Sequence, residues 1–163
     1  MSTSIAQFSG AALYLDTTAF YALLRALEPA AKDLFNRIER GDYQAYTSVL
    51  TFDELSYRLL LALIRDRYPG SPLEQLRQQE EKLIATLYPQ LAPTLDQLRH
   101  FPNLLWLDVT ATDLASMSQA MLDYHVRPRD ALHLTAIQKC GCFDVVSQDA
   151  DFDRIPVLRR YVF

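Results

Sequence analysis

Short apolar runs alternate with longer segments of helical periodicity, and this alternation restricts the fold more than any other feature of the sequence. The runs predict strands at residues 12–15, 44–48, 104–109 and 143–147, with a fifth candidate at 157–162. Because parallel strands are joined by crossover connections that are usually helices, the alternation indicates a parallel sheet covered on both faces. The predicted fold class is α/β, a three-layer α/β/α sandwich with a mostly parallel sheet of four to five strands.

Helical spacing of apolar residues fills the segments between the strands, which predicts helices at residues 19–27, 30–40, 50–67, 112–124 and 129–140. A further helical segment lies at about residues 66–100, where Pro89 and Pro93 are expected to divide the helix. We interpret it as a helical insertion in a single domain over residues 1–163, since a chain of 163 residues suffices for one well-buried core.

Charge and hydropathy exclude some classes of protein. The formal net charge is −4, so bulk positive charge does not mark the chain as a nucleic-acid binder. Several arginines can still form a local positive rim: Arg25, Arg58, Arg65, Arg67, Arg127, Arg129 and Arg154. No apolar run has the length of a membrane span, and residues 1–10 lack the pattern of a signal peptide, so we expect a cytoplasmic protein without membrane contact.

Four acidic residues occur where an apolar run meets the next segment: Asp16, Glu54, Asp130 and Asp149. The carboxyl ends of parallel strands line one edge of a sheet, where such folds bind ligands, so these carboxylates are expected to converge. Mg²⁺ and Mn²⁺ prefer oxygen ligands of this kind. The pattern therefore predicts a divalent-metal site.

Each of these acids also has a structural interpretation. Asp16 is suited to cap the following helix, and Glu54 stands three residues after Thr51, as in a capping box. A carboxylate at Asp130 gains from the helix dipole with or without a metal. Asp149 opens an Asp-x-Asp-x-Asp run that lacks the glycine and glutamate of a calcium-binding EF-hand loop, which leaves a solvated turn or a place in the crevice.

Residues close to the four acids in the sequence are assigned supporting roles. Within the acidic run we assign Asp149 to the crevice, Asp151 to an auxiliary position and Asp153 to the surface. His133 follows Asp130 by three residues and can hydrogen-bond to it on a helix, and we interpret it as a structural imidazole rather than a metal ligand.

Several short motifs, taken in order, resemble those of the PIN-domain nucleases, and most closely the VapC-type toxins of toxin–antitoxin pairs. The motifs are Leu15-Asp16-Thr17, Thr47-Ser48 followed by Glu54-Leu55, Arg129-Asp130-Ala131-Leu132-His133-Leu134 and Ser147-Gln148-Asp149-Ala150-Asp151-Phe152. Two features depart from the family pattern. Ser147 stands where threonine is usual, and the segment at about residues 66–100 is longer than in compact toxins.

The resemblance implies a metal-dependent ribonuclease that uses Mg²⁺ or Mn²⁺ to hydrolyse RNA. It implies Asp16, Glu54, Asp130 and Asp149 as the catalytic and metal-binding acids, with Asp151 as an additional metal ligand. It also implies a small antitoxin partner and a homodimer. Two alternatives stay open, namely an inactive PIN-fold binding module and a nuclease of housekeeping RNA processing.

Overall fold

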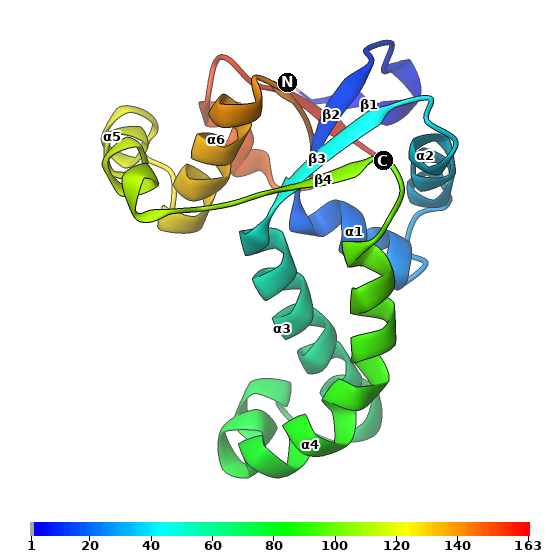
Figure 1. Ribbon diagram of the computed structural model, residues 1–163. Helices are drawn as coiled ribbons and strands as arrows, with labels where there is room; N and C mark the ends of the chain where they lie inside the picture. The colour runs from blue at the N-terminus through cyan, green and yellow to red at the C-terminus, as the bar shows by residue number, and fades with distance from the viewer. Residues whose placement is uncertain (1) are drawn as a thin grey trace. The chain divides into compact units, whose positions relative to one another are not determined.

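The computed structural model describes residues 2–163 and contains one six-stranded sheet (Figure 1). The strands, in their order across the sheet, are β1 (Thr3–Ser4), β6 (Arg159–Val162), β5 (Asp144–Val146), β2 (Ala12–Leu15), β3 (Gln44–Ser48) and β4 (Leu104–Leu107). Every neighbouring pair is parallel. The predicted α/β class is confirmed, but the sheet has one strand more than the predicted maximum. The extra strand is β1, whose two residues are too few to show a sequence period.

The α-helices are α1 (Thr17–Leu24), α2 (Pro29–Glu39), α3 (Val49–Arg67), α4 (Pro72–Arg99), α5 (Leu114–Tyr124) and α6 (Pro128–Cys140). Three short 3₁₀ helices complete the described part of the chain: η1 (Ile5–Gln7), η2 (Ala111–Asp113) and η3 (Ala150–Arg154). No helix within residues 2–163 combines the length and the apolarity needed to cross a membrane.

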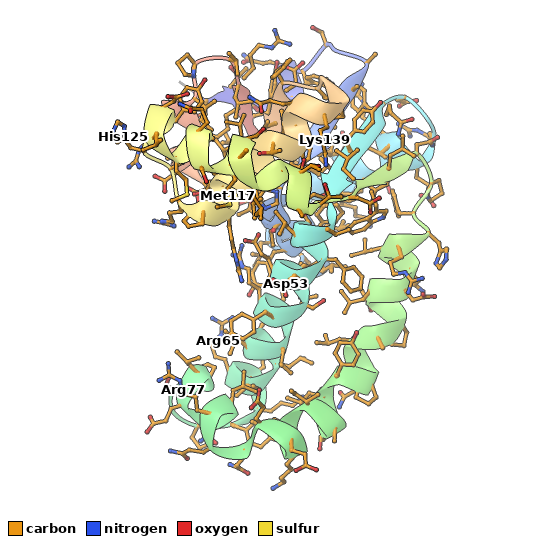
Figure 2. All side chains as sticks on the ribbon, turned by 60° about the vertical axis from the view of Figure 1, so that its left-hand side comes forward. Asp53, Arg65, Arg77, Met117, His125 and Lys139 are labelled. Carbon is orange, nitrogen blue, oxygen red and sulfur yellow. The ribbon has the colours of Figure 1, made fainter. Side chains whose placement is uncertain are left out.

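Helices cover both faces of the sheet (Figure 1). On one face, Phe20 of α1 stacks on Trp106 of β4, with 6.3 Å between ring centroids. On the other face, Ile137 of α6 packs in a buried cluster with Tyr14 of β2. Helix α5 lies outside α6 and contributes Met117 to a second cluster (Figure 2). These contacts produce the predicted three layers.

The strand order reverses at β2. The chain runs from β2 through β3 to β4 on one side, then returns to β5 on the other side of β2. In open α/β sheets this switch point, at the carboxyl ends of the strands, is the usual place for a ligand. Here it lies between the residues that follow β2 and those that follow β5.

The chain forms two compact units. The first consists of the residues up to Thr51 together with those from Pro102 onward, and the second is Phe52–Phe101. The second unit is helical and contains α4, which continues through both of its prolines. The prediction that these prolines divide the helix is wrong. Buried leucines keep helical spacing on both sides of the prolines, and the packing of these leucines outweighs the backbone hydrogen bonds that the prolines remove. These residues are Leu83, Leu87, Leu91, Leu95 and Leu98. The break in α4 lies instead at Gln79, where φ is −136° and ψ is 35°.

Candidate functional site

Asp16 follows β2 directly and is almost completely buried. One oxygen of its carboxylate, Oδ2, accepts hydrogen bonds from the hydroxyls of Ser147 at 2.7 Å and Thr18 at 2.9 Å. The same oxygen caps α1 by accepting from the backbone N–H of Thr18 at 3.4 Å. Asp16 therefore is a helix cap, as one interpretation expected, and its carboxylate also has a fixed orientation at the switch point.

The hydroxyls around Asp16 link the two loops of the switch point. Ser147 Oγ accepts from the backbone N–H of Asp149 at 3.0 Å, and Thr18 Oγ1 accepts from the backbone N–H of Gln148 at 2.9 Å. Ser147 thus uses its hydroxyl as donor and acceptor at once.

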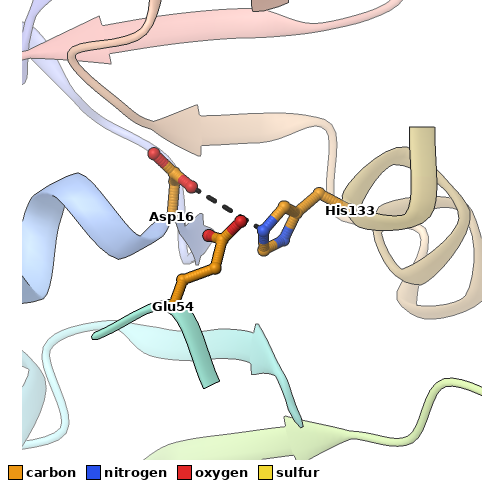
Figure 3. A group of neighbouring side chains, drawn as sticks. All are labelled: Asp16, Glu54 and His133. Atoms are coloured by element: carbon orange, nitrogen blue, oxygen red, sulfur yellow. Dashed lines mark ion pairs between the residues drawn. The ribbon is translucent and has the colours of Figure 1, made fainter. Parts of the chain in front are cut away.

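His133 lies on α6 and faces Asp16 (Figure 3). Its Nε2 is 3.9 Å from Asp16 Oδ1, and its Nδ1 is 2.7 Å from the hydroxyl of Tyr14. The sequence suggested contact with Asp130 only, because that residue is one helical turn away. The partners Tyr14 and Asp16 are more than a hundred residues distant, so no local pattern could indicate them.

Glu54, which Figure 3 also draws, lies on α3 in the unit formed by Phe52–Phe101. Helix α3 begins at Val49, so Thr51 lies inside the helix and is not the N-cap that the capping-box interpretation expected. The hydroxyl of Thr51 instead hydrogen-bonds to that of Thr47 at 2.8 Å.

A group of three carboxylates comes from α6 and the segment after β5. Asp130, Asp149 and Asp151 each offer an oxygen, and these oxygens lie within 4.8 Å of one another. Asp149 Oδ1 accepts from the backbone N–H of Asp151 at 2.9 Å, which begins η3. Asp151 also pairs with Arg127 at 3.5 Å and with Arg154 at 3.2 Å.

Asp130 has the most perturbed electrostatics of this group. Burial raises the pKa of its carboxyl, and the negative charges of Asp149, Asp151 and Asp16 raise it further, while His133 opposes them. Its Oδ2 is buried and has no hydrogen-bond partner among residues 2–163. A buried carboxylate oxygen without a donor is costly, and a cation bound beside it would remove that cost.

The neighbouring Asp153 has a different role. Its carboxylate forms a two-pronged pair with Arg160, with both N–O distances 2.8 Å. Arg160 in turn donates to the backbone carbonyl of Ser147 at 3.2 Å and is buried. Asp153 therefore supports the loop that carries Ser147 and does not join the three carboxylates.

The arrangement brings Asp16, Asp130, Asp149 and Asp151 to the carboxyl edge of one parallel sheet. The family model of the PIN domain matches residues 13–158 of this chain. The chain belongs to the PIN domain family. No curated protein matches it in sequence.

Solved structures share the PIN fold with this chain at low sequence identity. The Klebsiella pneumoniae toxin–antitoxin complex is 15% identical with a TM-score of 0.59, over 90% of this chain and 94% of that one. VapBC2 of Rickettsia felis, bound to a promoter DNA fragment, is 13% identical with a TM-score of 0.56, over 93% and 98%. Mycobacterium tuberculosis VapC20, a Sarcin-Ricin loop cleaving toxin, is 17% identical with a TM-score of 0.56, over 86% and 92%.

Proposed function

We propose that this PIN domain is a metal-dependent endoribonuclease that hydrolyses RNA phosphodiester bonds with Mg²⁺ or Mn²⁺. The observation that carries the proposal is the buried Oδ2 of Asp130, which has no donor within residues 2–163 and lies beside the oxygens of two further carboxylates. Hard divalent cations take ligands of this kind. Membership of the PIN domain family, and the similar structure described as a Sarcin-Ricin loop cleaving toxin, support the same reaction.

In this proposal Asp16, Asp130 and Asp149 hold the ion, Asp151 assists, and Glu54 acts on it directly or through water. A bound divalent ion supplies positive charge that activates a water molecule and offsets the charge on the phosphate and leaving oxygens. The chain supplies the orientation of the ligands. Ser147 and Thr18 already fix Asp16 through Oδ2, so the carboxylate loses little entropy when an ion binds.

Arginines beside the acidic group are suited to bind the RNA backbone. The side chains of Arg127 and Arg154 are 75% and 55% exposed, and both pair with Asp151. Phosphate oxygens can replace the carboxylate as partners of these guanidinium groups. Local positive charge would then bind RNA although the chain as a whole is acidic.

We further propose that the protein is the toxin of a toxin–antitoxin pair, is inhibited by a small antitoxin and forms a homodimer. Two of the similar structures are described as a toxin–antitoxin complex and as VapBC2. In this proposal residues 1–163 act as one PIN-like domain, with the segment at about 66–100 as its helical insertion.

Cleavage of a panel of RNAs by the purified protein with Mg²⁺ tests the nuclease. Wild type is expected to cleave at least one RNA, and Asp16→Asn and Asp130→Asn are expected to lose that activity. Asp123→Asn, which changes an exposed aspartate on α5, is the matched control and should cleave normally. Equal cleavage by all four proteins would indicate a contaminating nuclease, and no cleavage by wild type would favour the inactive binding module.

Expression in cells tests the toxin assignment. Wild type is expected to arrest growth, and co-expression of a small protein encoded directly upstream should restore it. Normal growth with an active enzyme would favour housekeeping RNA processing instead.

A further inference from the structure

His133 is a buried polar ring between a phenol and a carboxylate. Only 1% of its surface is exposed. Its Nδ1 lies 2.7 Å from the Tyr14 hydroxyl, and its Nε2 lies 3.9 Å from Asp16 Oδ1 (Figure 3). Phe152 contacts the imidazole edge to face, with 6.5 Å between ring centroids, so packing as well as hydrogen bonding sets the ring orientation.

The Tyr14 hydroxyl is placed where it can fix which ring nitrogen of His133 carries the hydrogen. A neutral phenol has a hydrogen to donate, and Nδ1 of His133 lies 2.7 Å from the Tyr14 hydroxyl, within hydrogen-bonding distance. In a neutral imidazole the second nitrogen then carries the N–H, and here that nitrogen is Nε2.

The opposite tautomer is unfavourable at this position. It would direct the lone pair of Nε2 at the negatively charged Oδ1 of Asp16, and the two would repel each other. With the hydrogen on Nε2, the contact with Oδ1 becomes attractive. At 3.9 Å this attraction is between charge and dipole, since the distance exceeds that of a hydrogen bond.

We propose that His133 is a positioning residue that orients Asp16 through its Nε2–H, in the tautomer set by Tyr14. Ser147 and Thr18 hold Oδ2 of the same carboxylate, so both oxygens of Asp16 face donors. The further statement that this orientation favours ion binding rests on the proposed function. A protonated Nε2 has no lone pair to give, so His133 supports a metal ligand without being one.

NMR of the complete protein, labelled with ¹⁵N in histidine, tests the tautomer directly. Long-range ¹H–¹⁵N spectra at neutral pH are expected to show His133 with the hydrogen on Nε2, both without and with Mg²⁺. The His133→Gln variant assigns the signal, and the exposed rings of His100 and His125 give internal references. A hydrogen on Nδ1, or loss of the Nε2 hydrogen when Mg²⁺ is added, would overturn the proposal.

Mn²⁺ titration of the same proteins tests the consequence. His133→Leu is expected to bind Mn²⁺ about 10–100-fold more weakly than wild type, as for other residues that orient metal ligands. His133→Gln keeps an N–H near the position of Nε2 and should recover most of that affinity. Equal weakening in both variants, with folding verified by circular dichroism, would contradict a positioning role.

The two proposals can fail separately. If wild type cleaves no RNA but shows the expected tautomer, the nuclease proposal fails and the hydrogen-bond assignment for His133 stands. If wild type cleaves RNA but His133 carries its hydrogen on Nδ1, only the positioning role is lost.

Discussion

At the scale of single residues, the surroundings of Asp130 disfavour the charged form of its carboxylate. Burial and three neighbouring carboxylates raise its pKa in the folded protein above the value in the unfolded chain. Ionisation of Asp130 therefore destabilises the metal-free fold, and this cost disappears as the pH falls through the raised pKa.

Replacement of Asp130 by asparagine is thus expected to raise the melting temperature in EDTA at neutral pH. The same variant should lose the rise in melting temperature that Mg²⁺ gives to wild type, because ligand binding to the folded state is stabilising. Scanning calorimetry with and without Mg²⁺ measures both effects, with Asp123→Asn as the control. A metal-free Asp130→Asn protein that melts below wild type would contradict the electrostatic account.

Tyr14 gives a second prediction at this scale. Tyr14→Phe removes the hydroxyl that donates to Nδ1 of His133. The Ser48 hydroxyl is 3.5 Å from that nitrogen, at the outer limit for a hydrogen bond that could replace the lost one. An unsatisfied buried polar atom is expected to lower the free energy of unfolding by about 1–3 kcal/mol. Urea denaturation measures this change in the free energy of unfolding. The control variant Tyr88→Phe, at an exposed tyrosine, should change stability by less than about 0.5 kcal/mol. Equal stability of the two variants would show that the buried contact contributes nothing.

At the scale of elements, α5 and α6 are joined by an ion pair as well as by apolar packing. Lys139 of α6 donates to Oδ2 of Asp113, the residue just before α5, at 2.7 Å. Asp113 also accepts from the backbone N–H of Thr110 at 2.7 Å. Hydrogen bonding, first from Lys139 and then from Thr110, lowers the pKa of Asp113.

The pH dependence follows from the sign of that shift. A lowered pKa in the folded state means that Asp113 stabilises the protein above its unfolded pKa, and that this contribution is lost as the pH falls through the folded pKa. Asp113→Asn is therefore expected to unfold at lower urea than wild type at neutral pH. The two midpoints should converge in acid. A difference that does not depend on pH would exclude ionisation of Asp113 as the cause.

Sequence patterns predicted the main elements because strand and helix periods are local properties. The order of strands and helices, and the carboxyl-edge position of Asp16 and Asp149, follow from such patterns. The two-residue strand β1 carries no period, and the continuity of α4 through Pro89 depends on packing that local rules do not describe. The Tyr14–His133 contact depends on side-chain conformation across the core, so sequence patterns could not indicate it.

At the scale of the whole molecule, the parallel order of the sheet is what brings distant acids together. Asp16 follows β2, Asp149 follows β5, and β2 and β5 are neighbours. Asp130 reaches the same edge from the first turn of α6. Each of these aspartates has a role in local helix structure, but only the strand order explains why their negative charges are close enough to interact.

In the proposed nuclease, these carboxylates share one divalent-ion site. Crystals grown with Mn²⁺ and measured for anomalous scattering test it most directly. We expect an anomalous peak in contact with Asp130 Oδ2 and with carboxylate oxygens of Asp16 or Asp149. A crystal with Mn²⁺ bound elsewhere, and with Asp130 Oδ2 satisfied by a protein donor instead, would contradict it.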